Sequence, residues 1–399
     1  MPPNPLLAGI RILDLSRLLP GPFATLYLAQ LGAEVIKIEE PEGGDYTRHL
    51  LPALFEQVNR GKKSVTLDLR KAEHLAHFKR MVAEADVVVD TFRPEVLPRL
   101  GCGYETLKQI NPRLVFAALT GYGHTGPYRN RPGHDMNYRG YAGELAQNGP
   151  RDGAPQVGDF QVADLAGALS CVIGILAAVV GARASGSGCF VDIAMLDCTL
   201  ALQVATLSDL RTLGRVPARG TGMLSGAMPN YGVYECADGR YLALGSLERK
   251  FFVNFCKLVG REDLLELPYA PGRKSQALRA ALAELIRQRT RDEWEAQLAD
   301  EDSCASAILD MQEVVHNPQV KARGLIEWNQ GKPACGMPIQ FDGAPRPALP
   351  PSPRLGEHNA EILGPPQQTC PVLPAIRQEL RDIGLAGTAG QSFAAIQRG

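Results

Sequence analysis

Short runs of β-branched and other apolar residues alternate with helical patterns along the first 200 residues of the chain. Such short apolar runs are typical of buried strands, and strands that alternate with helices form a parallel sheet with helices on its faces. We predict strands at 10–15, 34–39, 64–69, 86–90 and 113–119. We predict helices at 23–33, 71–84 and 94–110, and a Pro-Gly-Pro turn at 20–22.

The pattern changes after about residue 220, where two apolar runs flank the dipeptide Asp238-Gly239. This dipeptide favours a tight turn, so 231–246 is predicted to form a hairpin. Helical patterns follow at 249–259, 276–288 and 291–299, and the Pro-rich segment 345–354 predicts a linker or a strap along the surface. We therefore expect a large domain at 1–200, a linker at 201–224, a small α+β domain at 225–330, and a Pro-rich linker with a C-terminal segment returning to the large domain at 331–399.

One stretch, residues 165–182, carries no charge over eighteen residues, which is the length at which a membrane span becomes a candidate. It is rich in small residues, and Gly167, Gly174 and Gly181 recur at intervals of seven. That spacing places the glycines on one side of a helix, where another backbone can approach closely. We interpret the stretch as a buried helix of a large domain.

Composition narrows the class of protein. The chain has 42 Lys and Arg against 43 Asp and Glu, so its net charge of −1 gives no general attraction to nucleic acid or to an anionic membrane. Its nine cysteines include no Cys-x-x-Cys pair, which argues against a disulfide framework and a structural zinc site. No signal-peptide pattern is seen at the start. We expect a soluble, cytoplasmic protein of enzyme size without a metal.

The glycine-rich segment 121–126, GYGHTG, has the spacing of a dinucleotide-binding loop and follows a predicted strand. That motif also needs a helix that begins within the glycines and an acidic residue at the end of the next strand. PYRNRPG follows instead, so we interpret the segment as a flexible loop. No P-loop, HExxH or GxSxG motif is present, and the hydrolases that depend on them lose support.

Acid and base side chains stand in loops and turns near these elements. His134 and Asp135 follow the glycine segment, Asp164 comes directly before the apolar helix, and Glu248 follows the second hairpin strand. Each of these residues also has an ordinary structural explanation. Asp164, directly before the helix, is expected to cap it. A lone histidine is more often a structural residue, and Glu248 is ordinarily a solvated carboxylate. Cations near strand ends, which could contact phosphates, are Lys62, Lys63 and Arg93; a solvated basic turn is the alternative for the lysines.

In combination and order, several segments resemble the CaiB/BaiF family, also called class III CoA-transferases. They are residues 7–41, NRGKKSVTLDLR (59–70), DVVVDTFRPEVLPRLG (86–101), NPRLVFAALTGYGHTGP (111–127), GHDMNY (133–138), the ADLAGAL stretch (163–169) and SGSGCFVDIAMLD (185–197). The resemblance implies a Rossmann-like large domain, a small domain and a homodimer of two interlocked rings. It also implies CoA thioester substrates held by the large domain, with CoA entering as part of the substrate and no tightly bound cofactor.

The family contains two chemistries. In its transferases, the aspartate at the position of Asp164 attacks the acyl-CoA to give a mixed anhydride and then an aspartyl-CoA thioester, and a carboxylic acid accepts the CoA. Asp159 is the competing position for that nucleophile. In its α-methylacyl-CoA racemases, the residues matching His134 and Asp164 exchange the α-proton on opposite faces, assisted by the residue matching Glu248. Backbone N–H groups near Asp164 would then stabilise the enolate oxygen.

Three features lean towards the racemase branch: Pro20 in LLPGPF, the intact GHDMNY segment and the absence of a glycine run in the small domain. We therefore expect a racemase-type enzyme, with a transferase as the alternative and a non-catalytic CoA-binding partner subunit as a third hypothesis. The resemblance assigns CoA binding to Lys62, Arg93, Asp135 and Tyr138. The acyl cavity is expected to include Leu18, Leu19, Met223 and Tyr231. The two leucines favour an apolar acyl chain over a dicarboxylate.

Overall fold

The computed structural model describes residues 6–267, 273–329, 331–342 and 348–364. Contacts divide the chain into residues 1–357 and a second unit, His358–Gly399. The described part of the second unit contains the short helix α17 (Asn359–Leu363). Everything below concerns the first unit.

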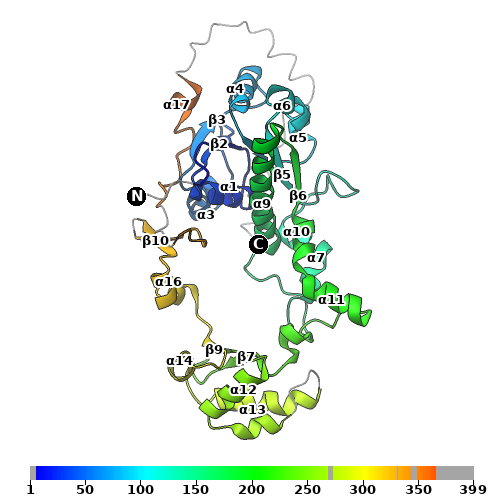
Figure 1. Cartoon of the computed structure of the whole chain (residues 1–399), viewed down its shortest axis with the longest axis vertical. Coiled ribbons are helices and arrows are strands. Elements are labelled where there is room, and N and C mark those ends of the chain that lie inside the picture. Colours follow the sequence, from blue (N-terminus) through cyan, green and yellow to red (C-terminus); the bar gives the residue numbers. More distant parts are fainter. Residues whose placement is uncertain (1–5, 268–272, 330, 343–347, 365–399) are drawn as a thin grey trace, which may run out of the picture. The chain divides into compact units, whose positions relative to one another are not determined.

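A six-stranded parallel sheet with the order β3-β2-β1-β4-β5-β6 organises the first part of the chain (Figure 1). Its strands are β1 (Arg11–Asp14), β2 (Glu34–Glu39), β3 (Lys63–Thr66), β4 (Val87–Asp90), β5 (Val115–Thr120) and β6 (Phe190–Ala194). All five predicted strands are therefore confirmed. Successive strands are added in one direction from β1 to β3 and in the opposite direction from β4 to β6. Ligands of such sheets bind outside the carboxyl ends of the strands at this switch point, between β1 and β4.

Strand β6 was missed by the sequence analysis. It is an edge strand whose first three residues are only partly covered, and it follows the Gly- and Ser-rich segment 185–188. A half-exposed edge strand lacks the continuous apolar run that identifies a central parallel strand.

Two local predictions about helices are wrong. The Pro-Gly-Pro segment forms the first turn of helix α1 (Pro20–Gln30), where proline is tolerated because the first N–H groups of a helix have no internal partner. The single helix predicted at 94–110 is two helices, α5 (Val96–Arg99) and α6 (Tyr104–Ile110). The break contains Gly101, whose φ of 74° lies in the left-handed region. The remaining helices of this part are α2 (Thr47–Leu50), α3 (Pro52–Val58), α4 (Ala72–Ala83), α7 (Asp135–Ala142), α8 (Glu144–Gln147), α9 (Val162–Ser185), α10 (Met195–Leu202) and α11 (Val204–Leu213).

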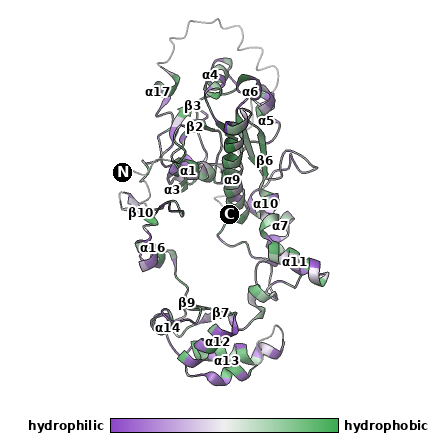
Figure 2. Ribbon diagram, viewed as in Figure 1, coloured by the Kyte–Doolittle hydropathy of each residue, from purple (hydrophilic) through white to green (hydrophobic). Residues whose placement is uncertain are grey.

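Helix α9 packs against α1, β5 and β6, and its buried side chains belong to the main hydrophobic core. Close neighbours lie at Gly167, where a Cβ would be 2.7 Å from the Met195 side chain, and at Gly174, where it would be 2.9 Å from the Val191 side chain, but they are side chains and not the backbone that the spacing predicted. Gly181 has open space around it. Within the described chain, α9 is the one helix long and apolar enough to cross a membrane by length and composition, and 39% of its most apolar window is buried. The predicted buried helix is thus buried on one face, and hydrophobic residues run along its length (Figure 2).

A second hydrophobic cluster lies between residues 234 and 305. The predicted hairpin is confirmed as β7 (Tyr231–Glu235) and β8 (Tyr241–Gly245), to which β9 (Ala305–Ala307) adds a third antiparallel strand. The predicted helices appear as α12 (Arg249–Leu258), α13 (Gln276–Ile286) and α14 (Arg291–Leu298), around the buried Trp294. The other elements are η1 (Met223–Ala227), η2 (Glu262–Glu266), η3 (Arg273–Ser275), α15 (Met311–Val314), α16 (Pro318–Ala322), β10 (Ile326–Asn329) and β11 (Lys332–Cys335). The domain boundaries at 200, 224 and 330 stay predictions.

The described part of the Pro-rich segment runs along the first part of the chain as a strap. Pro350 accepts a hydrogen bond from the Gly61 N–H at 2.9 Å, and Pro353 accepts one from the Arg48 guanidinium at 3.0 Å. Residues 345–347 lie outside the described chain.

Candidate active site

A cavity of about 750 Å³ opens at the carboxyl ends of β1, β4 and β5. It is lined by the residues that follow each of these strands and by side chains from α7 and α9. The lining residues include Arg17, Leu18, Arg93, Arg129, Arg131, His134, Tyr138 and Asp164. The cavity therefore occupies the switch point of the sheet, where a ligand is expected.

Asp164 lies in the first turn of α9, because the helix already begins at Val162. The expectation that Asp164 itself caps the helix is wrong. The cap is Asp135, whose Oδ1 accepts hydrogen bonds from the backbone N–H groups of Ala163 at 2.7 Å and Asp164 at 3.3 Å. Asp164 keeps its own carboxylate for the cavity.

This arrangement also corrects the predicted oxyanion hole. The N–H groups of Ala163 and Asp164 donate to Asp135, and the N–H of Leu165 donates to the Gln161 carbonyl at 3.0 Å. These donors at the start of α9 are occupied. Stabilisation of a developing negative charge must then come from other groups that line the cavity.

The surroundings of Asp164 disfavour the charged form of its carboxyl group. Burial, together with the nearby charge of Asp135, raises the pKa of Asp164 to about 7. Both effects disfavour the charged carboxylate. Near neutral pH the side chain is therefore present both as carboxylate and as carboxylic acid, which suits a general base that must also return a proton.

His134 occupies the position directly before α7, with its backbone N–H donating to the Asn137 side chain at 3.0 Å. Its side chain lines the same cavity as Asp164. The structure thus brings together the two residues that the sequence analysis paired, although thirty positions separate them in the chain.

Tyr138 also lines the cavity and donates its hydroxyl hydrogen to the Gly133 carbonyl. Its ring lies against Gly121, where any Cβ would overlap the ring. The glycine segment that the sequence analysis treated as a flexible loop therefore has a packing role, because glycine is needed for this close approach. No helix begins within it, in agreement with the rejection of a dinucleotide-binding loop.

Lys62 and Asp135 are not brought to the cavity. The Lys62 ammonium is buried and donates to Asp14 at 3.1 Å, to Thr25 at 2.7 Å and to Asn59 at 2.9 Å, and also to the Pro22 carbonyl at 2.9 Å. Asp135 is 8% exposed and faces the start of α9. Their contact with CoA stays a prediction, and their positions show them holding the elements around the cavity in place.

Arg93 is exposed, lines the cavity and makes no side-chain hydrogen bond or ion pair within the described chain. Three further arginines line it that the sequence analysis did not single out: Arg17, Arg129 and Arg131. Arg17 stacks over Phe92 at 4.9 Å, and Arg131 stacks over Tyr128 at 3.7 Å. Their position in the sequence could have identified them. Arg17 comes shortly after the predicted strand 10–15, and Arg129 and Arg131 lie in PYRNRPG, directly after the glycine-rich segment 121–126.

A second cavity of about 300 Å³ shares Arg17, Tyr46, Phe92 and Val96 with the first. It also contains Arg70. The two cavities therefore form one groove along the carboxyl ends of the strands. The smaller cavity is also lined by Glu39, Glu40 and Asp68, and Arg70 pairs with Asp68 at 2.7 Å. Within the described chain the lining guanidinium groups without an ion pair are those of Arg17, Arg93 and Arg131, and such groups suit a ligand that carries phosphates.

Residues predicted from the second part of the chain are placed elsewhere. Glu248 is exposed at the position directly before α12, and Glu248, Met223 and Tyr231 do not line the cavity within the described chain. Of the two leucines expected there, Leu18 lines it and Leu19 does not. Leu18 has a φ of 66°, a strained conformation for a leucine, and such strain is found most often at functional sites.

Comparison with known proteins identifies the family. The family model of CoA-transferase family III matches residues 7–359. The chain is 35% identical to succinate–glutarate CoA-transferase of Agrobacterium fabrum, over 90% of this chain and 95% of that one. It is 32% identical to the human α-methylacyl-CoA racemase, over 90% of this chain and 92% of that one. A crystal structure of a CaiB/BaiF family protein from Brucella suis superimposes with a TM-score of 0.80 at 35% identity, covering 90% of this chain and 98% of that one. The chain belongs to CoA-transferase family III, the CaiB/BaiF family, and is an enzyme that acts on CoA thioesters.

Proposed function

We propose that this enzyme exchanges the α-proton of a 2-methylacyl-CoA thioester, as an α-methylacyl-CoA racemase does. The observation that carries the proposal is the presence of two proton-transfer groups, His134 and Asp164, in one cavity. A transferase needs a single carboxylate nucleophile, whereas inversion at the α-carbon needs a base on each face. The pKa of Asp164, raised to about 7 by burial and Asp135, supports the same role.

In this mechanism one of the two side chains takes the α-proton as the C–H bond breaks, which leaves an enolate. The other side chain then donates a proton to the opposite face of the α-carbon. The negative charge on the enolate oxygen is stabilised by the guanidinium groups that line the cavity, since the N–H groups at the start of α9 are occupied. Each cycle returns the pair in the complementary protonation state, ready for the reverse reaction.

The groove supports a specific placement of CoA. Its nucleotide would occupy the smaller cavity, its phosphates would lie near Arg17 and Arg93, and pantetheine would lead on to His134 and Asp164. This places the cations along the phosphates and the acyl group in the larger cavity. Leu18 lines that cavity and favours an apolar acyl chain.

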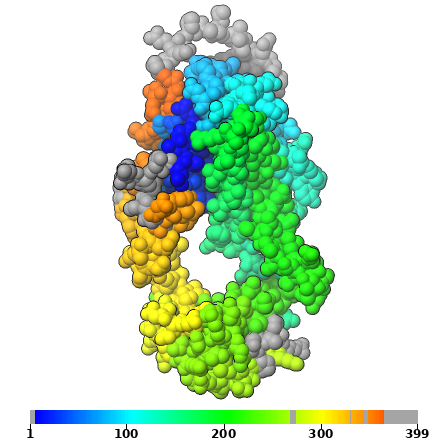
Figure 3. Space-filling model, in the orientation of Figure 1, coloured from blue at the N-terminus to red at the C-terminus, as the bar shows by residue number. Residues whose placement is uncertain are grey.

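A second copy of the chain is part of the proposal. Helix α9 exposes Leu169, Ile173 and Val180, and the following helices expose Leu202, Val204 and Leu213. These segments, coloured green from about residue 165 onward, lie open on the face shown in Figure 3. An apolar surface of this extent favours burial against a partner. In a homodimer, the partner would cover these helices and its second part would supply the glutamate that corresponds to Glu248.

The test is proton NMR of the purified enzyme with 2-methylacyl-CoA in D2O, with no acceptor acid present. We expect deuterium to replace hydrogen at the α-carbon, because the side chain that donates to the opposite face has exchanged its own proton with D2O and therefore delivers a deuteron. Complete retention of the α-hydrogen while the thioester is bound would overturn the proposal.

The second candidate is a CoA-transferase, favoured by the similarity to succinate–glutarate CoA-transferase and by a partly buried Asp164 that faces the cavity. In that case Asp164 would attack the acyl-CoA and form an aspartyl-CoA thioester. Hydroxylamine would then inactivate the enzyme after treatment with acyl-CoA, and no deuterium would enter the α-carbon. The two candidates thus give opposite results in the same sample.

His134→Ala is expected to lower α-proton exchange by about 10²–10⁴-fold, the range typical of a lost general base. The affinity for CoA should stay within about threefold of the wild-type value, because His134 lies in the larger cavity and not in the proposed nucleotide cavity. Isotope exchange and isothermal titration measure the two effects. His77→Gln, on α4 and outside both cavities, is the control, and an unchanged exchange rate in His134→Ala would remove His134 from the mechanism.

A further inference from the structure

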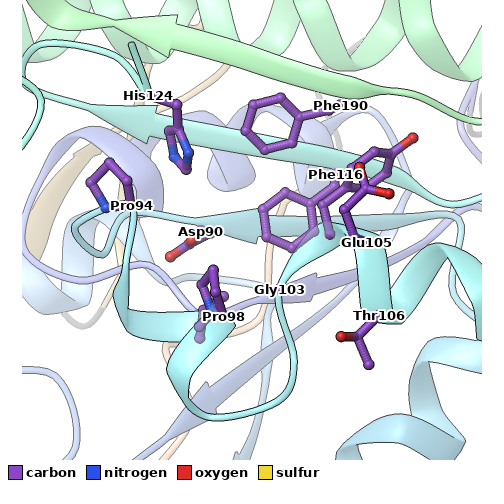
Figure 4. Close-up of a pocket in the computed structure, with 11 residues that line it drawn as sticks. Asp90, Pro94, Pro98, Gly103, Glu105, Thr106, Phe116, His124 and Phe190 are labelled. Carbon is purple, nitrogen blue, oxygen red and sulfur yellow. The ribbon is translucent and has the colours of Figure 1, made fainter. Parts of the chain in front are cut away.

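A third cavity, of about 380 Å³, differs from the candidate active site because its lining contains carboxyl groups and no Lys or Arg. It is lined by the last residue of β4, by residues at the beginning of β5 and β6, and by residues of the helices α5 and α6 (Figure 4). Its walls are apolar apart from a few polar groups. The lining residues include Asp90, Tyr104, Glu105, Phe116, His124 and Phe190.

Asp90 ends β4 and is only 2% exposed. One of its carboxylate oxygens accepts a hydrogen bond from the Phe92 N–H at 2.8 Å, and no Lys or Arg of the described chain forms an ion pair with it. Burial raises the pKa of Asp90 to about 7, against the Phe92 hydrogen bond. A buried carboxyl group without a cation is costly, and a ligand that supplies a cation would relieve that cost.

His124 faces the same cavity, and its ring and the Asp90 carboxyl group are directed into the same side of it in Figure 4. Its Nε2 atom is buried and has no hydrogen-bond partner. Burial lowers the pKa of His124, so the ring is held neutral and offers one nitrogen as an acceptor. The cavity therefore contains a buried carboxyl group, Asp90, that no Lys or Arg of the described chain pairs with, and a buried ring nitrogen, His124 Nε2, without a hydrogen-bond partner.

Aromatic rings form another wall of the cavity. Phe116 and Phe190 are stacked with ring centroids 5.7 Å apart, and Tyr104 lies 5.9 Å from Phe116 and 5.5 Å from Phe190. The faces of such rings attract cations and pack against flat apolar groups. The volume lies within the range of small-molecule sites.

We propose that this cavity binds a small organic monocation, an amine or amidine carried on an aromatic or alicyclic body. The cationic N–H groups would donate to Asp90 and His124, and the apolar body would pack against Phe116, Phe190 and Tyr104. The proposal does not depend on which reaction the enzyme catalyses.

The cavity also touches the CoA groove. Pro94 lines both this cavity and the larger active-site cavity, and Leu97 lines both this cavity and the smaller one. Both residues lie just after Arg93 in the chain. A bound amine would therefore contact the segment that presents Arg93 to the substrate, which gives the site a route to influence substrate binding.

The test is isothermal titration of the wild-type enzyme, without acyl-CoA, against benzylamine and benzamidine. Benzyl alcohol and benzoate serve as neutral and anionic ligands of matching shape. We expect the two cations to bind at least about tenfold more tightly than benzyl alcohol, and benzoate to bind more weakly still. Equal affinity for benzylamine and benzyl alcohol, or no binding of either cation, would overturn the proposal.

Two variants locate the binding. Asp90→Asn keeps an oxygen for the Phe92 N–H and removes the charge, and it should lower benzylamine affinity at least about tenfold. Glu105→Gln removes the same charge from an exposed position on the same cavity, and it should change the affinity less than about threefold. A larger loss in Glu105→Gln than in Asp90→Asn would contradict the assignment. The ligand series above needs no variant, so the proposal can fail even if Asp90→Asn does not fold.

Discussion

Replacement of Asp164 by asparagine is expected to lower α-proton exchange by about 10²–10⁴-fold, because the amide neither takes nor returns a proton. Binding of CoA should survive, since the proposed nucleotide cavity does not contain Asp164. The same substitution would also abolish a transferase, in which Asp164 is the nucleophile. Asp164→Asn alone therefore does not separate the two reactions, but His134→Ala does. In a transferase, His134→Ala should still form the aspartyl thioester, whereas in a racemase it should lose α-proton exchange.

The stability of Asp164→Asn should change with pH in a defined direction. Burial and the charge of Asp135 raise the pKa of Asp164 in the folded protein to about 7, whereas an unfolded aspartate titrates near its ordinary value of 3.8. The folded state therefore loses stability as pH rises from about 4 to about 7, and the loss is complete above that range. Asparagine removes the cost, so the variant should be more stable than the wild type at pH 8, by on the order of 2–4 kcal/mol, and nearly equal at pH 4.

Denaturant unfolding at the two pH values, together with isotope exchange and isothermal titration with CoA, measures these effects. Asp159→Asn is the matched control, because Asp159 is exposed and does not line the cavity. It should leave exchange, affinity and stability nearly unchanged. Loss of CoA affinity in Asp164→Asn, with exchange in Asp159→Asn equally impaired, would show that this segment binds the substrate and that Asp164 is not its proton-transfer group.

The parallel sheet could be predicted because its central strands are continuous apolar runs that alternate with helices. Edge strand β6 could not, because a half-exposed strand has no such run. The first and last residues of the helices could not be predicted from the pattern of apolar and polar positions either. Proline marks turns as often as first turns of helices, so the Pro-Gly-Pro segment had two valid interpretations until the packing of α1 decided between them.

The candidate site shows the same division between local and long-range information. His134 and Asp164 were found because each stands in a motif, and the fold confirms that both line one cavity. Asp135 was assigned to CoA because it shares the motif of His134. Its actual partners, the N–H groups of Ala163 and Asp164, lie about thirty residues away, and no local pattern records such a pairing. The resemblance identified the family, and only the fold distinguishes groups that face the cavity from groups that hold it in shape.

Lys62→Met is expected to destabilise the protein by about 3–5 kcal/mol, the cost of leaving one partner of a buried ion pair alone. Lys62 and Asp14 have fully buried side chains joined at 3.1 Å. Burial opposes ionisation of Asp14, but the charges of Lys62 and Lys37 hold the pKa of Asp14 below its usual range. Without Lys62, much of that compensation is lost, and Thr25 and Asn59 each lose a donor as well.

The neighbouring substitution Lys63→Met separates this role from a general loss of charge. Lys63 pairs with Glu34 at 2.9 Å, and both side chains are about one third exposed, so its removal should cost less than about 1 kcal/mol. Denaturant unfolding measures both variants, and isothermal titration measures their affinity for CoA. We expect Lys62→Met to lose stability while its folded fraction binds CoA normally, because the ammonium points into the protein. Normal stability with weakened CoA binding would show instead that Lys62 reaches the substrate, as the family resemblance implies. The stability of β1 and of the loop that carries Arg17 and Leu18 would then rest on Lys37 and its buried partner Asp45, which lie 3.0 Å apart.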